Sequence, residues 1–213
     1  MAYKHGIYTS EIPTSIVPPV NGTACLPVVF GTAPLHLATD RAQVNKPVLC
    51  YTYAEAVAAL GYSDDWKSYT LCEVIKSQFA LYNRAPVVFV NVLDPAVHKK
   101  SVTAENVALT NHVGYINDPV LLETLKLKET SDGDYLTEGT DYEAAFNDEG
   151  ALVITALTDG AIAAAVKLVA EYDKLDPEAV DGDDIVGGID VNTGTVKGLE
   201  TLNNVFPLFG LVP

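Results

Sequence analysis

The sequence predicts an α+β fold: a small α/β layer domain, an extended N-terminal arm before it, and an inserted antiparallel β domain, sandwich or barrel-like. Apolar runs and helical segments alternate over residues 24–93, and short strand candidates with turn residues between them follow over residues 97–180. The charge also changes near residue 100. Residues 1–100 hold eight Lys and Arg against seven Asp and Glu, whereas residues 101–213 hold five against twenty-one.

These observations divide the chain into three parts. Residues 1–19 form the arm, residues 20–96 with 183–213 form the base domain, and residues 97–182 form the inserted acidic β domain. The near-neutral first half can approach other surfaces, while the acidic second half repels its own copies and nucleic acid. We therefore expect no nucleic-acid partner.

The length and composition are those of a folded protein. The chain has 213 residues, of which 48% are hydrophobic and 19% charged, enough for one large or two small cores. No apolar run approaches the roughly 18–20 residues of a membrane span, and no secretory signal is recognisable, so we expect no direct membrane insertion. The three cysteines lack metal-ligand spacing and indicate reduced thiols in a protein made in a cytosol.

The N-terminal arm reads as extended chain. Three prolines forbid a helix there and favour β or polyproline geometry, and residues 7–12 favour a strand. A frayed terminus is the alternative interpretation, because the residues alone show nothing for the arm to pack against.

The base domain is predicted to contain three strands and two helices. The strands are 24–31, 47–52 and 86–93, and the helices are 53–60, with Gly61 at its stop position, and 68–82. One apolar face of the second helix is predicted from residues at spacings of three and four, namely Leu71, Val74, Ile75, Gln78 and Phe79. This order indicates an α/β layer with a mainly buried sheet.

The β domain is predicted from strand candidates at 113–116, 121–128, 140–146 and 151–156, with a tight hairpin at 147–150. Residues 161–172 fit either a helix or a strand, and a strand from about Ala165 is preferred because its neighbours are strands. The final residues form an apolar run that closes on Pro213, so we expect the chain to be a fragment cut before another strand.

No catalytic or metal-binding pattern is recognisable, so neither a cofactor nor catalysis is expected. The four histidines, His5, His36, His98 and His112, are scattered and are interpreted as surface or edge residues. The acidic clusters 147–149 and 181–184 lack the spacing of a calcium loop and are interpreted as solvated turns. Gly187 and Gly188 are interpreted as serving backbone geometry.

Several stretches together resemble contractile phage tail sheath proteins, which also occur in phage-tail-like bacteriocins. The first stretch is 183–190, Asp-Asp-Ile-Val-Gly-Gly-Ile-Asp, which is followed by Asn192-Thr193-Gly194, Gly198-Leu199 and Val205-Phe206-Pro207. The second is the opening Gly6-Ile7-Tyr8-Thr9-Ser10-Glu11. The third, in the predicted β domain, comprises Tyr135, Gly139, Asp141-Tyr142 and Asp148-Glu149-Gly150. The resemblance covers most of the chain. The family's subtilisin-like sheath domain and C-terminal arm have no counterpart among these residues, so we expect the chain to be an N-terminal fragment.

The resemblance implies a mechanical function. Sheath subunits form stacked helical rings around an inner tail tube, and on a signal from the baseplate the stack shortens and drives the tube through a cell envelope. The resemblance implies assembly in the bacterial host cytoplasm and a place in a virion tail or tail-like particle. It also implies that the arm contacts a neighbouring subunit by strand addition, through Gly6, Ile7, Tyr8, Thr9, Ser10, Glu11 and Ile12.

Two other classes of function stay open. The β domain could be a binding module for a cell-surface glycan or protein, with Tyr115, Tyr135 and Tyr142 as the candidate aromatic residues, although core positions are the preferred interpretation of all three. An enzyme ranks third, because no nucleophile, base or metal set can be named.

Overall fold

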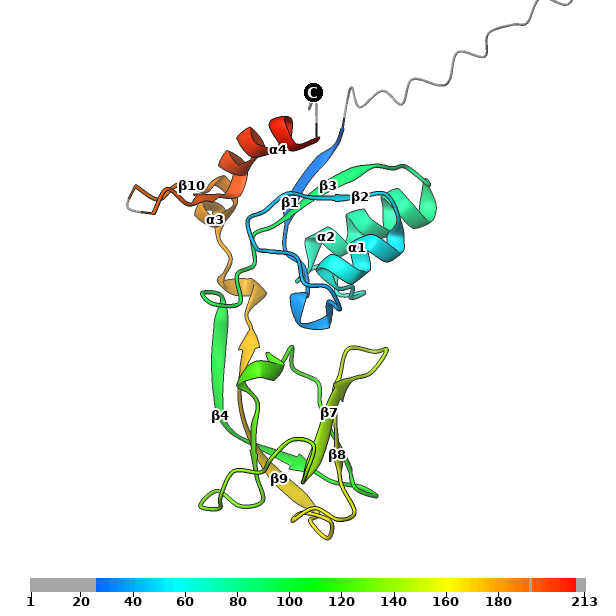
Figure 1. Cartoon of the computed structure of the whole chain (residues 1–213), viewed down its shortest axis with the longest axis vertical. Helices are drawn as coiled ribbons and strands as arrows, with labels where there is room; N and C mark the ends of the chain where they lie inside the picture. The colour runs from blue at the N-terminus through cyan, green and yellow to red at the C-terminus, as the bar shows by residue number, and fades with distance from the viewer. Residues whose placement is uncertain (1–25, 192, 210–213) are drawn as a thin grey trace, which may run out of the picture.

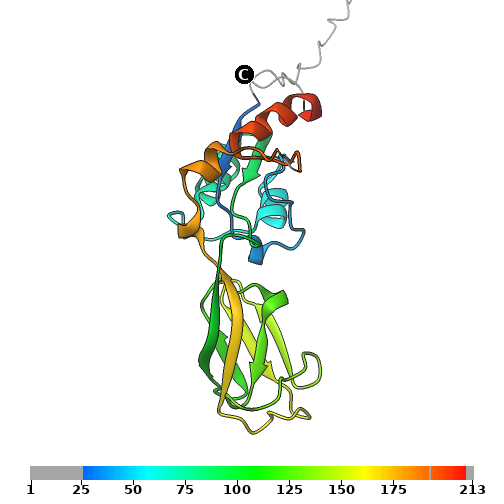
Figure 2. The ribbon, with the colours of Figure 1, turned by 90° about the vertical axis from the view of Figure 1, so that its left-hand side faces the viewer.

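The computed structural model describes residues 26–191 and 193–209. The chain forms two lobes, one above the other in Figure 1. Residues 26–98 and 176–209 form the base lobe, and residues 99–175 form the β lobe. The chain passes between the lobes twice, and the two passages lie close together where β4 (Lys99–Ala108) begins and β9 (Lys167–Leu175) ends (Figure 2). Mixed helices and strands confirm the predicted α+β class.

The base lobe contains a three-stranded sheet in the order β1-β3-β2. β3 (Val87–Asn91) is central and buried at every residue, as a sequence that is apolar up to Asn91 predicts. β1 (Val28–Gly31) pairs with it in parallel and β2 (Val48–Cys50) pairs antiparallel. All three predicted strands exist, each shorter than its apolar run.

Helices cover both faces of this sheet. α1 (Tyr53–Leu60) and α2 (Thr70–Ile75) pack on one face, around Leu60, Leu71 and Phe89. α4 (Leu202–Phe209) packs on the other face, where Val205 meets Leu26 and Val88 (Figure 1). Alternate residues of β3 therefore contact opposite helix layers.

The two predicted helices of the base lobe differ in how well they match the structure. α1 has the predicted bounds; Thr52 Oγ1 accepts a hydrogen bond from the Glu55 N–H at 3.2 Å, and Gly61 follows with φ +76°. The second helix is regular only over α2 and continues as the π-helical η2 (Lys76–Leu81). Leu71 and Ile75 are buried as predicted, whereas Val74, Gln78 and Phe79 are half-buried. Val74 and Phe79 still pack against the same core as Leu71 and Ile75.

The rest of the base lobe lies after the β lobe in sequence. It comprises η4 (Pro177–Ala179), α3 (Gly182–Val186), the β10 (Gly188–Ile189) and β11 (Val196–Lys197) ribbon, η5 (Gly198–Thr201) and α4. The sequence pattern predicts none of these elements. The helix α4 contains Pro207, which argues against a helix in sequence reasoning.

The β lobe consists of two three-stranded antiparallel sheets. One has the order β4-β9-β6, with β6 at Lys126–Lys128, and the other β5-β8-β7, with β5 at Val113–Ile116, β7 at Tyr142–Phe146 and β8 at Leu152–Ala156. Their inner residues form one core that includes Leu127, Ile154 and Leu168. Within the described residues neither sheet closes into a barrel.

Three features of this lobe differ from, or refine, the prediction. The strand β4 was missed because most of its residues are exposed and its pairing with β9 shifts between Val102 and Glu105, which destroys a simple alternation. Residues 121–128 are not one strand but η3 (Leu122–Thr124) followed by β6. The ambiguous segment is a strand, as preferred, but it begins at Lys167.

Candidate functional site

The predicted contact residues Gly6, Ile7, Tyr8, Thr9, Ser10, Glu11 and Ile12 lie outside the described residues. The described chain begins at Leu26, which is buried between Val205 of α4 and Val88 of β3. The described chain therefore begins beside α4, at the end of the base lobe away from the β lobe (Figure 1).

Within the described residues, no three His, Cys, Asp or Glu side chains are placed to hold a metal ion. Both acidic clusters have a local backbone role instead. Asp181 Oδ1 accepts hydrogen bonds from the N–H groups of Asp183 and Asp184 at the start of α3, and Asn147 Oδ1 accepts from the N–H groups of Glu149 and Ala151 in the hairpin.

The described thiols are structural. Burial raises the pKa of Cys50 and of Cys72 to about 11, so both stay protonated. In the described part of the chain, no helix has the length and apolar character needed to cross a membrane.

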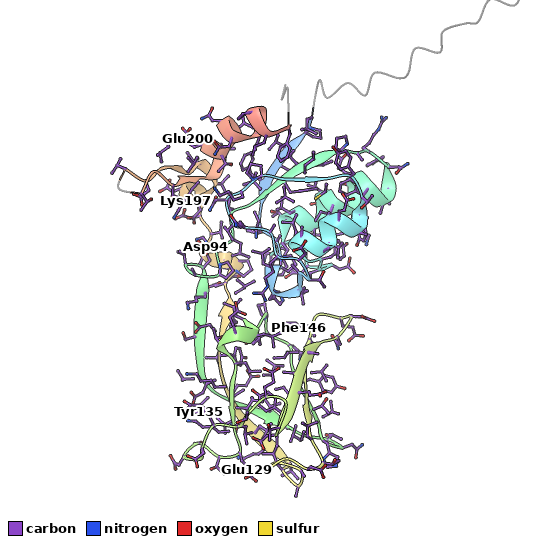
Figure 3. All side chains as sticks on the ribbon, in the orientation of Figure 1. Asp94, Glu129, Tyr135, Phe146, Lys197 and Glu200 are labelled. Carbon is purple, nitrogen blue, oxygen red and sulfur yellow. The ribbon has the colours of Figure 1, made fainter. Side chains whose placement is uncertain are left out.

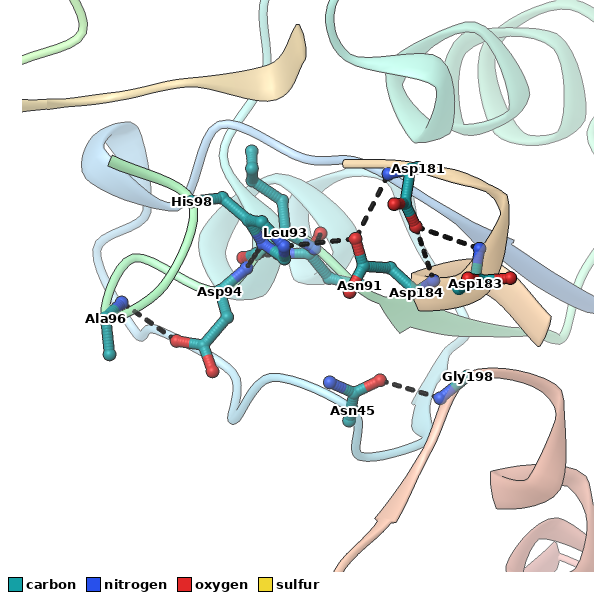
Figure 4. Close-up of polar contacts among 10 residues, drawn as sticks. All are labelled: Asn45, Asn91, Leu93, Asp94, Ala96, His98, Asp181, Asp183, Asp184 and Gly198. Atoms are coloured by element: carbon teal, nitrogen blue, oxygen red, sulfur yellow. Dashed lines mark hydrogen bonds and ion pairs between the residues drawn. The ribbon is translucent and has the colours of Figure 1, made fainter. Parts of the chain in front are cut away.

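The most organised polar group lies at the junction of the two lobes and centres on His98 (Figure 4). The prediction that His98 is a surface or edge residue is wrong, because its side chain is buried. Its Nδ1 accepts a hydrogen bond from the Asp94 N–H at 2.9 Å, so Nε2 carries the proton and faces Asp184 Oδ2 at 3.2 Å. Asp184 Oδ2 also accepts from the Asp181 N–H at 3.0 Å.

His98 thereby joins the two passages of the chain. Asp94 and His98 lie on the passage into the β lobe, whereas Asp181 and Asp184 lie just beyond the passage back. A backbone hydrogen bond also joins the two passages, because the Asp176 N–H donates to the His98 carbonyl oxygen at 3.0 Å. We call this group, Asp94, His98, Asp176, Asp181 and Asp184, the neck cluster.

Asn91 anchors the neck to the base sheet. Its side chain is buried at the end of β3, and its Oδ1 accepts hydrogen bonds from the N–H groups of Ala33 at 3.0 Å and Leu93 at 3.1 Å. A polar residue in an otherwise apolar strand is satisfied in this way. The chain consequently leaves the sheet in a defined direction just before the neck cluster.

An apolar cluster also spans the two lobes. Leu121 and Leu175 of the β lobe pack with Tyr69, Cys72 and Leu93 of the base lobe. Beside it, Arg41 and Glu123 pair across the lobes at 3.1 Å, on the surface, where such a pair adds little. Burial in the apolar cluster therefore stabilises the contact between the lobes more than this ion pair does.

His36 makes a third contact between the lobes. It lies in η1 (Leu35–Leu37), is 6% exposed, and packs edge-on against Phe146 at a ring distance of 5.4 Å. Figure 3 shows Phe146 at the end of the β lobe that faces the base lobe. Among the described residues the Nδ1 atom finds no hydrogen-bond partner. Burial, followed by the positive charge of Arg41, lowers the pKa of His36 to about 4. His36 is thus a neutral packing residue, which corrects its prediction as a surface residue.

An open cleft of about 590 Å³ lies beside this contact. Four acidic residues, Asp65, Glu149, Asp176 and Glu178, line it together with Lys100 and Lys174, so acidic groups outnumber basic ones. The contacts between the lobes together form a structural joint.

The tyrosines proposed for a binding module separate into two kinds. Tyr142 is buried in the core of the β lobe, as preferred from the sequence, but Tyr115 and Tyr135 are exposed. Tyr135 lies under the ammonium groups of Lys128 and Lys126, and its hydroxyl donates to Glu171 Oε2 at 2.9 Å. Its polar contacts within the chain leave the outer part of the ring accessible.

The sequence is similar to that of the tail sheath protein of Burkholderia phage BcepMu. The two are 29% identical over 211 residues, which are 98% of this chain and 41% of the phage protein. The chain thus spans about two fifths of the length of this curated relative. No family model and no solved structure matches the chain. The resemblance to phage tail sheath proteins is confirmed.

Proposed function

We propose that the chain forms part of a structural subunit of a contractile tail sheath, in a phage or a phage-tail-like particle. The subunits polymerise around an inner tube and shorten on a signal from a baseplate, driving the tube through a cell envelope without catalysis. The similarity to a phage tail sheath protein over nearly the whole chain is the observation that carries this proposal.

In this proposal the base lobe, with helices on both faces of its sheet, corresponds to the predicted α/β base domain, and the β lobe corresponds to the predicted inserted acidic domain; the two-lobed arrangement of the elements supports this division. The neck cluster and the apolar cluster between the lobes let the β lobe follow the base lobe as one body. A sheath subunit needs this coupling when the stack shortens.

The arm is the proposed tether between neighbouring subunits. Residues 6–12 add a strand to a neighbour's sheet, so their backbone groups find partners outside their own subunit. Alternate side chains then face opposite sides, with Ile7, Thr9 and Glu11 on one and Tyr8, Ser10 and Ile12 on the other. Such a link persists while rigid bodies shift.

Electron microscopy of the natural gene product that contains these residues tests the proposal. Hollow striated tubes in negative stain are expected, and deletion of residues 6–12 is expected to abolish tubes while circular dichroism stays unchanged. A deletion of residues 1–4 is the matched control and should leave tubes intact. Dispersed monomers of the intact product at high concentration and moderate salt would refute the proposal.

A binding module is the second candidate, and the exposure of Tyr115 and Tyr135 favours it. In that reading the β lobe recognises a cell-surface glycan or protein through these rings. Binding of the purified chain to host cells that is lost in Tyr135→Ala, with no tubes from the intact product, would move this candidate to first place.

A further inference from the structure

An open hollow lies beside the β10–β11 ribbon at one side of the base lobe. Its volume is about 460 Å³, and its lining includes Asp183, Ile189, Val191 and Lys197. Ile189 is 59% exposed and Val191 is 93% exposed. Large apolar side chains this exposed, grouped around one hollow, are typical of an interaction surface.

The hollow has a fixed shape and a negative surround. Gly187 lies so close to the Lys197 carbonyl that a Cβ at Gly187 would fall 2.0 Å from that oxygen. The Gly198 N–H donates a hydrogen bond to Asn45 Oδ1 at 2.9 Å (Figure 4). The charged residues that line the hollow are Asp183, Asp184 and Asp190 against one basic residue, Lys197. A partner that fits would present an apolar or aromatic group next to a positive charge.

The base lobe itself carries such a group on its opposite side. At the end of η2, Leu81 is 68% exposed and Tyr82 is 69% exposed, and the exposed Arg84 follows. The turn is held by hydrogen bonds from the Tyr82 N–H to the Ser77 carbonyl and from the Arg84 N–H to the Gln78 carbonyl. Residues 76–85 contain Lys76 and Arg84 and no acidic residue. We call Leu81, Tyr82 and Arg84 the knob.

We propose that the knob of one copy of this chain seats in the hollow of the next copy. Leu81 and Tyr82 then cover Ile189 and Val191, and the Arg84 guanidinium faces the Asp183 carboxylate. Tyr and Arg are the residue types that dominate binding energy at protein interfaces. That the occupant is a second copy rests on the proposed function, whereas the complementarity of the two surfaces is independent of it.

The placement of the two surfaces determines the kind of assembly. The ribbon lies at the left of the base lobe in Figure 1, and the end of the helix that continues from α2 lies at the right. Because knob and hollow are different surfaces, their contact is heterologous and leaves a free knob at one end and a free hollow at the other. Copies therefore add head to tail instead of stopping at a symmetric dimer.

Complementation between two defective variants tests this contact. Val191→Asp places a charge in the hollow, and Tyr82→Asp places a charge on the knob. In sedimentation velocity each variant is expected to self-associate at least tenfold more weakly than the unchanged chain. A mixture of the two contains one intact knob and one intact hollow, so it should form heterodimers and nothing larger. Tyr115→Asp, on the exposed surface of the β lobe, is the control and should associate like the unchanged chain.

A charge exchange gives a second readout that does not depend on apolar contact. Arg84→Glu and Asp183→Lys should each weaken association, and their mixture should recover it. A mixture of Val191→Asp and Tyr82→Asp that stays monomeric, while the unchanged chain associates, would overturn the knob-and-hollow contact. So would an unchanged chain that stays monomeric at all concentrations.

The knob-and-hollow contact and the sheath function can each be refuted without refuting the other. Striated tubes from a natural gene product that carries Val191→Asp would overturn the knob-and-hollow contact and leave the sheath function standing. Heterodimers in the mixture, together with no tubes from the intact product, would support the contact and refute the sheath function.

Discussion

Acidification is expected to destabilise the contact that His36 makes between the two lobes. In the folded chain the pKa of His36 is lowered from 6.5 to about 4, whereas an unfolded chain has the ordinary value. Between these values the unfolded chain binds a proton that the folded chain excludes, so stability is fully present above pH 6.5 and falls as the pH drops toward 4. A tenfold change in proton affinity is worth about 1.4 kcal/mol, which makes the full loss roughly 3 kcal/mol.

Urea unfolding at several pH values between 7 and 4.5 measures this effect. Trp66, the one tryptophan of the chain, lies in the base lobe and supplies the fluorescence signal. Carboxyl groups also titrate near pH 4, so the informative quantity is the difference in unfolding free energy between the unchanged chain and His36→Phe. This variant keeps an aromatic ring against Phe146 and binds no proton.

The difference should grow by about 2 kcal/mol or more in favour of His36→Phe as the pH falls from 7 to 4.5. The exposed His112 is the matched control, and His112→Gln should run parallel to the unchanged chain. Parallel curves for His36→Phe and the unchanged chain would refute the assignment of His36 as a buried neutral residue.

Three further changes are expected to act through backbone geometry, the core and the neck. Gly61→Ala should cost about 2–4 kcal/mol of unfolding free energy, because φ is +76° and the new Cβ would lie 2.2 Å from the Pro34 carbonyl oxygen. The control Gly139→Ala, where φ is +79° but the surrounding space is open, should cost about 1 kcal/mol. Equal costs for the two variants would contradict the role of the close approach at Gly61. Leu127→Ala should cost about 2–5 kcal/mol in the β lobe core, measured by urea unfolding followed by circular dichroism, and a loss below 1 kcal/mol would argue against a shared core. His98→Ala should remove the acceptor of the Asp94 N–H and one of the two partners of Asp184 Oδ2, so it should cost about 1–3 kcal/mol of unfolding free energy and speed proteolysis between the lobes. Unchanged cleavage would show that the neck does not depend on His98.

The parts of the fold that could be predicted are those in which local pattern and burial coincide. The run at 86–93 is apolar at nearly every position, and it became the central strand because only a central strand is buried on both faces. Thr52 caps the N-terminus of α1 and Gly61 ends the helix. The hairpin at 147–150 contains residue types that favour turns, such as Asn147, whose Oδ1 accepts from the Ala151 N–H. Such signals lie within a few residues of one another, so no distant contact is needed to interpret them.

The joint between the lobes could not be predicted, because its parts are far apart in the sequence. His98 and Asp184 look like an isolated histidine and a solvated acidic turn until the two passages of the chain are brought together. The strand β4 presents mostly polar side chains and is held by its pairing with β9. Its existence depends on a partner strand about 70 residues away in the chain, which local preference does not reveal.

The sequence by itself determined the α+β class, the break in charge between the two halves and the resemblance to tail sheath proteins, because composition, periodicity and motif order are local properties. Only the tertiary structure decided which histidines are buried, how the β lobe is joined to the base lobe, and that an apolar hollow and a projecting knob lie on opposite sides of the base lobe. Burial and surface complementarity are properties of residues brought together from distant positions. They exist only once the chain has folded.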